Sequence, residues 1–139
     1  MTILIDAYAV VALVRDEPAA DDVEALLGQS DVAVVSINLA EALDVLQRRD
    51  GVEESFLRTI LDPLFRMFLT VRPVGSRAAW RAAALRKMYY AKKQSEVSLA
   101  DCVLVAAARS ADVIATSDIP LLQMATGEGV ATIELPASA

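Results

Sequence analysis

Short apolar runs alternate along this chain with longer stretches in which apolar residues recur every three or four positions. Each short run is bounded by polar or turn-forming residues, as is typical of buried strands. The runs predict strands at Thr2–Ile5, Val32–Val35, Val113–Thr116 and Val130–Leu135, and a short extended segment at Thr70–Val74. Strands separated by helices indicate an α/β fold, in which a parallel sheet of about four to five strands is flanked by helices on both faces.

The stretches with helical spacing predict seven helices: Ala7–Val14, Pro18 to about Leu27, Ser36 to about Arg49, Val52–Leu69, Ser76 to about Lys92, Ser98–Ser110 and Ile119–Ala125. Pro18 suits a first helical position. We expect Asp50-Gly51 to end the third helix and Asp62-Pro63 to break or kink the fourth. No linker or internal repeat interrupts the pattern, so we expect residues 1–139 to form a single domain.

The chain contains one cysteine, Cys102, and no histidine. These absences exclude zinc sites built on histidine or several cysteines, as well as Ser-His-Asp, Cys-His and histidine-based ribonuclease chemistry. A single cysteine forms no internal disulfide, so a reducing cytoplasm is the expected compartment. No apolar run reaches the roughly 18 residues of a membrane span. The first six residues, Met-Thr-Ile-Leu-Ile-Asp, lack the basic start of a signal peptide.

The net charge of −6 would by itself argue against a nucleic-acid ligand. Residues 1–62, however, carry 13 of the 19 acids, whereas residues 63–95, the acid-free segment, carry none. That segment holds eight of the 13 basic residues: Arg66, Arg72, Arg77, Arg81, Arg86, Lys87, Lys92 and Lys93. A solvated helix face would explain them, but such faces usually mix both signs. The acid-free segment therefore favours an anionic ligand.

Four acids stand where the predicted elements place them at one edge of the sheet. Asp6 directly follows the first predicted strand, Thr2–Ile5, and Asp118 comes just after the predicted strand Val113–Thr116. Glu41 and Asp101 lie in the first turns of two predicted helices. In open parallel sheets, ligands bind at the carboxyl ends of the strands. We therefore expect these four carboxylates to lie at one site.

Helix capping is the alternative explanation for the four acids. Asn38 stands three residues before Glu41, and Ser98 stands three residues before Asp101, which is the spacing of a capping box. Asp6 and Asp118 stand where helix N-caps are expected. Four converging carboxylates in apolar sequence, however, are costly to bury and raise one another's pKa values. A divalent cation removes both penalties, and an all-carboxylate donor set favours Mg²⁺ or Mn²⁺.

These acids belong to four short motifs in this order: Ile5-Asp6, Asn38-Leu-Ala-Glu41, Ser98-Leu-Ala-Asp101 and Thr116-Ser-Asp118. The series resembles the PIN-domain nucleases and, in length, the VapC-type toxins of bacterial toxin–antitoxin pairs. The resemblance spans residues 3–121. It implies that the four acids are both catalytic residues and ligands of Mg²⁺ or Mn²⁺, with Asn38 and Thr116 as supporting residues.

Two features depart from the family pattern. Many relatives place Arg or Lys directly after the last acid, whereas Ile119-Pro120 follows here, so no phosphate contact is expected from that position. Asp44 and Asp112 are additional acids near the motifs, and we expect both at the surface.

The resemblance implies a metal-dependent endoribonuclease that acts as a homodimer and is held by a cognate antitoxin. Arg86, Lys87, Lys92 and Lys93 are candidate phosphate contacts, and Tyr89 is a candidate platform for an unpaired base. The alternative to RNA contact is that these basic side chains are simply solvated and that Tyr89 packs in the core. The apolar stripe of the fourth helix is either core or one wall of an antitoxin groove: Phe56, Leu57, Ile60, Leu61, Leu64, Phe65, Phe68 and Leu69.

Two other enzyme classes also place an Asp directly after the first strand, but neither fits this chain. Haloacid-dehalogenase-like phosphatases place a second Asp where this chain has Tyr8, and receiver domains need a lysine after a late strand, whereas no lysine follows Lys93. A PIN-like module that binds RNA or protein without cutting remains the alternative.

Overall fold

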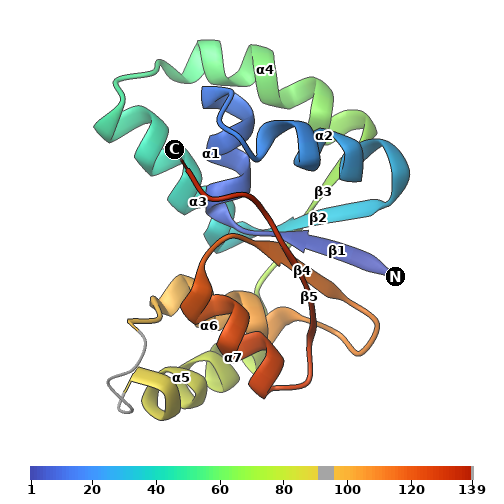
Figure 1. The fold of residues 1–139 in the computed structure, drawn as a ribbon. Helices are drawn as coiled ribbons and strands as arrows, with labels where there is room; N and C mark the ends of the chain where they lie inside the picture. The colour runs from blue at the N-terminus through green and yellow to red at the C-terminus, as the bar shows by residue number, and fades with distance from the viewer. Residues whose placement is uncertain (91–95, 139) are drawn as a thin grey trace.

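The computed structural model describes residues 1–90 and 96–138. Its centre is a five-stranded, fully parallel sheet with the strand order β3-β2-β1-β4-β5 (Figure 1). The strands are β1 (Thr2–Ile5), β2 (Asp31–Val35), β3 (Leu69–Arg72), β4 (Val113–Thr116) and β5 (Ala131–Glu134). The predicted α/β architecture is therefore confirmed.

Helices cover both faces of the sheet. The helical elements are α1 (Ala7–Arg15), α2 (Ala20–Gln29), α3 (Ser36–Asp44), the π-helical turn η1 (Val45–Arg49), α4 (Glu54–Met67), α5 (Ser76–Tyr90), α6 (Leu99–Ala107) and α7 (Ile119–Gly127). Helices α1 to α4 lie above the sheet in Figure 1, and α5, α6 and α7 lie below it. We call these two groups the upper and lower layers.

Two apolar clusters fill the space between the sheet and the two layers. Alternate residues of a strand point to opposite faces, so Ile3 and Ile5 join the upper cluster while Leu4, between them, joins the lower one. All three are at most 2% exposed. A strand buried on both faces reads as a continuous apolar run, which is why β1 could be recognised from the sequence.

Two predicted helix boundaries are wrong. Pro18 does not begin a helix but lies in a turn before α2, where the Ala20 N–H donates to the Glu17 carbonyl at 2.8 Å. Proline suits the second position of such a turn as well as a helix start. Leu69 belongs to β3 rather than to α4, and it pairs with Val32.

Helix α4 continues through Pro63, so the expected break is also absent. The proline removes one helical hydrogen bond, but Leu57 and Leu61 on the same helix are buried against the sheet. Their burial outweighs the lost bond.

The predicted stop at Asp50-Gly51 is confirmed. Gly51 has φ +70°, its N–H donates to the Gln47 carbonyl, and the Val52 N–H donates to the Leu46 carbonyl. A glycine in the left-handed conformation, followed by backbone N–H groups that donate to the last helical carbonyls, is a common end of a helix.

The predicted end of the basic helix at Lys92 lies outside the described residues, which resume at Glu96. In the described part of the chain, no helix is both long and apolar enough to cross a membrane.

Candidate active site

The centre of the sheet provides the base of the site. β1 and β4 are neighbours, yet the chain goes from β1 toward one edge of the sheet and from β4 toward the other. Ligands of open α/β sheets bind at this switch point, beyond the carboxyl ends of the strands. Asp6 directly follows β1, and Asp118 stands two residues after β4.

A buried hydroxyl joins these two acids. Thr116 is fully buried, and its hydroxyl donates to Asp6 Oδ2 at 2.5 Å. The same hydroxyl oxygen accepts the Asp118 backbone N–H at 3.0 Å. Asp6 also caps α1, because its Oδ1 accepts the Ala9 N–H at 3.0 Å. Asp118 stands at the N-cap of α7, but its side chain makes no capping hydrogen bond.

The third acid, Asp101, is held at the start of α6. The capping box predicted for Ser98 and Asp101 is confirmed: Ser98 Oγ accepts the Asp101 N–H at 3.0 Å, and Asp101 Oδ2 accepts the Ser98 N–H at 3.4 Å. One carboxylate oxygen of Asp101, Oδ1, takes no part in the box.

The capping box suggested for Asn38 and Glu41 is wrong, because α3 already begins at Ser36. Asn38 is instead fully buried, and its Nδ2 donates to the Ala100 carbonyl at 3.3 Å. This bond joins α3 in the upper layer to α6 in the lower layer. Asn38 Oδ1 is a buried acceptor with no donor among the described residues. Glu41 follows one turn later on α3 and is exposed.

The four acids influence one another electrostatically. Burial is the largest cause that raises the pKa of Asp6, from 3.8 to about 7, and the charges of Asp101 and Asp118 add to it. The pKa of Glu41 is also raised, mainly by burial and then by the charges of Asp101 and Asp118. Burial and the charge of Asp118 also raise the pKa of Asp101. The fold therefore concentrates negative charge at the switch point.

The donor chemistry of this site fits a hard divalent cation. All four side chains offer oxygen, and hard cations such as Mg²⁺ prefer carboxylate oxygens. A cation would also offset the burial and the repulsion that together raise these pKa values. The spacing is more open than a finished metal site, since no group of three or more acidic or cysteine side chains among the described residues is already arranged to hold an ion.

A family model described as "PIN domain" matches residues 3–125. The chain belongs to the PIN domain family. The predicted resemblance is thereby confirmed, and the match contains all four motifs. Comparison with curated protein sequences gives no match.

Several solved structures share this PIN fold. The chain is similar to a crystal structure of VapBC2 from Rickettsia felis bound to a promoter DNA fragment, with 16% identity, a TM-score of 0.72, and coverage of 98% of this chain and 100% of the other. It is 26% identical to FitAcB from Neisseria gonorrhoeae, with a TM-score of 0.64 and coverage of 95% and 96%. It is 17% identical to Mycobacterium tuberculosis VapC20, named as a toxin that cleaves the sarcin-ricin loop, with a TM-score of 0.56 and coverage of 75% and 78%.

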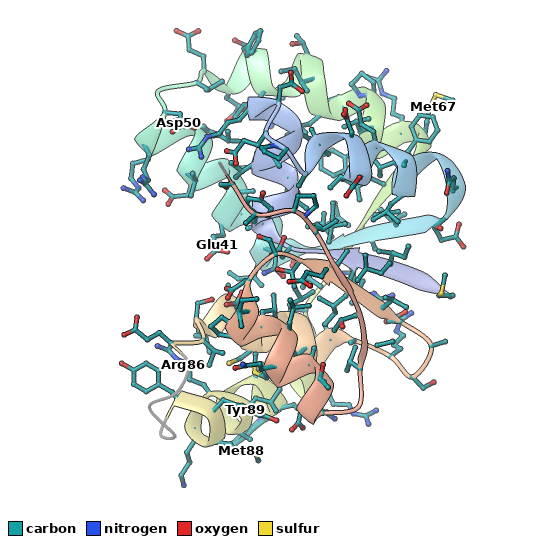
Figure 2. All side chains as sticks on the ribbon, in the orientation of Figure 1. Glu41, Asp50, Met67, Arg86, Met88 and Tyr89 are labelled. Atoms are coloured by element: carbon teal, nitrogen blue, oxygen red, sulfur yellow. The ribbon has the colours of Figure 1, made fainter. Side chains whose placement is uncertain are left out.

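The basic residues proposed to contact RNA are only partly placed beside this PIN-domain site. Arg86 lies near the end of α5, on the same side of the molecule as Glu41 (Figure 2). Its positive charge acts on Cys102, the residue after Asp101. Lys87 follows it on α5 and is exposed. Lys92 and Lys93 lie outside the described residues.

The two adjacent tyrosines of α5 have different roles. The Tyr89 hydroxyl donates to Glu128 Oε2 at 2.6 Å, and the ring packs on the lower apolar cluster beside Gly127. Tyr90 is 54% exposed, and the Arg86 guanidinium lies 5.0 Å from the centre of its ring. The sequence pattern alone did not single out Tyr90 as a candidate contact. Its position four residues after Arg86 on one helix is the signal that suggests a contact between Arg86 and Tyr90.

Of the two additional acids, Asp44 is exposed as expected, where it pairs with Arg48 at 3.0 Å. The surface position predicted for Asp112 is wrong. Asp112 is buried, accepts the Arg72 guanidinium at 2.6 Å, and also accepts the Arg109 N–H at 2.7 Å. Burial would raise the pKa of Asp112, but these hydrogen bonds and the positive charges outweigh it and lower the pKa.

Proposed function

We propose that this PIN-domain protein is a Mg²⁺- or Mn²⁺-dependent endoribonuclease and the toxin of a toxin–antitoxin pair. The observation that carries the proposal is that the Thr116 hydroxyl joins Asp6 and Asp118 at the switch point of the sheet, where the charge of Asp118 also acts on Glu41 and Asp101. Membership of the PIN family supports it, as does the similarity to VapC20, a toxin described as cleaving the sarcin-ricin loop.

Each residue has a defined part in this proposal. Asp6 and Asp118 form the floor of the site, and the Thr116 hydroxyl fixes their relative positions. Asp101 and Glu41 supply carboxylate oxygens from the two layers, and Asn38 keeps the starts of α3 and α6 together. A bound Mg²⁺ or Mn²⁺ supplies the Lewis acidity that activates water and offsets charge developing on the phosphodiester.

One observation favours a second candidate, a PIN-like module that binds without cutting. The described acids form no ready-made metal site. The two candidates differ in one measurable property, since only the nuclease produces new RNA ends in the presence of a divalent ion.

The test is cleavage of a broad RNA pool by the purified protein with Mg²⁺, with Mn²⁺ and with EDTA, followed by sequencing of RNA ends. We expect metal-dependent ends at defined positions, and we expect Asp101→Asn to abolish them. Asp31→Asn is the matched control, because Asp31 is an exposed acid at the start of β2, the opposite end of the strand from the site. Binding to RNA without cleavage under all these conditions would refute the nuclease and support the module.

The RNA-binding part of the proposal uses the end of α5. Arg86 and Lys87 would contact phosphates, and Tyr90, rather than the occupied Tyr89, would stack on an unpaired base. Lys92 and Lys93 follow in sequence and remain proposed contacts. A double Lys92→Ala/Lys93→Ala variant should bind RNA more weakly with a shallower dependence on salt. Unchanged affinity and salt dependence would remove both lysines from the interface.

We also propose a homodimer and an antitoxin groove, both implied by the VapC resemblance. A cavity of about 300 Å³ lies between α3 and α4, and its apolar lining includes Leu43, Leu57, Leu61 and Phe65. The stripe of α4 thus supplies core residues and one wall of this cavity at once. An apolar antitoxin helix would suit it. Light scattering at micromolar concentration tests the dimer, and a monomer there would count against it.

A further inference from the structure

Part of the acid-free segment lies away from the carboxylates and lines a separate cleft. This cleft of about 530 Å³ lies between the first half of α5 and the end of α6, and we call it the arginine cleft. Four arginines line it: Arg72, Arg77, Arg81 and Arg109. The rest of its lining is mostly glycine, alanine and serine. Small side chains leave room for a ligand to approach the backbone.

The arginine cleft keeps an excess of positive charge. Arg72 is matched by the buried Asp112 at 2.6 Å, and Arg81 lies 3.6 Å from Glu128. Arg77 and Arg109 have no ion-pair partner among the described residues, and both are exposed. The charge of Arg109 helps to lower the pKa of Asp112, but Asp112 is ion-paired with Arg72 and makes no ion pair with Arg109. Two guanidinium groups are therefore free to bind an anion.

Two guanidinium groups together suit a phosphate group more than a single carboxylate. A guanidinium is a planar fork that donates two parallel hydrogen bonds to carboxylate or phosphate oxygens. One fork occupies both oxygens of a carboxylate, whereas a phosphate group has further oxygens for a second fork. Arg77 lies in the first turn of the 15-residue helix α5, where the partial positive charge of the helix end adds to that of the side chain. Gly75 and Ala78 line the cleft at the same place.

The arginine cleft adjoins a groove that reaches Glu41, one of the four acids of the candidate active site. A groove of about 700 Å³ contains Glu41 together with Val74 and Val103, and most of its surface is apolar. Val74 belongs to the three-residue connection between β3 and α5, and its neighbours Pro73 and Gly75 line the arginine cleft. One short connection thus separates the two hollows. A chain that leaves the carboxylates along the apolar groove reaches the arginines next.

We propose that the arginine cleft binds the phosphate backbone of the RNA substrate on one side of the cleavage position, with Arg77 and Arg109 as the contacts. The inference rests on the proposed nuclease function, and it adds a second anchoring point beyond the end of α5. An acidic polypeptide is the competing ligand, and the experiment below separates the two.

The test measures binding of a fluorescent, unstructured RNA by anisotropy over a range of salt concentrations. All proteins carry Asp101→Asn so that the RNA stays intact. The parent is compared with Arg77→Ala/Arg109→Ala and with the control Arg49→Ala/Arg58→Ala. The control removes the same charge from two exposed arginines of the upper layer, on η1 and α4, neither of which lines the arginine cleft. A third variant, Arg77→Lys/Arg109→Lys, restores the charge without the fork.

Each phosphate contact on single-stranded RNA contributes about 0.7 to the slope of log K against log salt. We expect the slope to fall by about 1.4 in the Arg77→Ala/Arg109→Ala variant, to stay at the parent value in the control, and to recover in the lysine variant. Equal slopes in the alanine variant, the control and the parent would overturn the inference. So would stronger binding of a poly-glutamate peptide than of RNA at the cleft. Failure of the active protein to cleave, with the slope change retained, would overturn the nuclease and leave the arginine cleft as an RNA site.

Discussion

Asp6→Asn removes a buried negative charge while keeping the shape of the side chain. Asp6 is 4% exposed, and burial is the main reason that its pKa rises from 3.8 to about 7. An acid with a higher pKa in the folded than in the unfolded protein opposes folding when it is ionised. This cost is absent below pH 3.8, grows as the pH rises, and is complete above pH 7.

The size of the effect follows from the two pKa values. A rise of about three units at 1.36 kcal/mol each gives about 4 kcal/mol. The new amide oxygen can still accept the Ala9 N–H, and the Thr116 hydroxyl can turn to accept from the amide nitrogen. We therefore expect Asp6→Asn to gain up to about 4 kcal/mol of unfolding free energy relative to the parent between pH 4 and pH 8.

Urea denaturation in EDTA at intervals from pH 4 to pH 8 measures this difference. Asp112→Asn is the control with the opposite sign, because the pKa of Asp112 is lowered in the folded protein. Its contribution to stability is present above the unfolded pKa of 3.8 and is lost as the pH falls further. Since it breaks a buried ion pair, this variant should lose about 3–5 kcal/mol at pH 7. A difference between Asp6→Asn and the parent that does not change with pH would refute the reasoning.

Three further predictions concern the Thr116 bridge, the contact between Gly127 and Tyr89, and the packing of α4, and each is tested by urea denaturation. Thr116→Val leaves the Asp6 carboxylate and the Asp118 N–H without their partner, so it should cost about 1–3 kcal/mol; a neutral effect would contradict the bridge. Gly127→Ala would place a Cβ 2.6 Å from the Tyr89 hydroxyl oxygen, so it should destabilise the fold, and Tyr89→Phe should restore part of the loss in the double variant. Leu57→Ala should cost about 2–5 kcal/mol because Leu57 is 1% exposed, whereas Phe56→Ala, at 58% exposed, should cost under about 1 kcal/mol. Similar costs at both positions would show that α4 packs differently.

The sequence was sufficient where local pattern and burial agree. β1 and β4 have the predicted bounds, because both are apolar runs buried at the centre of the sheet. The meeting of Asp6 and Asp118 at one edge followed from parallel topology alone. The Ser98–Asp101 capping box was also readable, since both partners lie within three residues.

Other features depend on partners that are distant in the sequence. Asp112 looked like a surface acid because Arg72, which pairs with it, lies 40 residues earlier. Tyr89 looked available for a base because Glu128, which accepts its hydroxyl, lies 39 residues later. The role of Asn38 likewise depends on Ala100, 62 residues away. Local spacing offered a capping explanation, but only the packing of α3 on α6 shows the actual bond.

The Asn38–Ala100 bond crosses between the upper and lower layers, and the carboxylates come from both sides of the same boundary. An ion held by Glu41 on α3 and Asp101 on α6 would act as a clamp across that seam. Part of the binding free energy of the ion would then stabilise the contact between the two layers, which are otherwise joined by the sheet and by the Asn38–Ala100 hydrogen bond. Amide hydrogen exchange at the first turns of α3 and α6 should accordingly slow together on loading.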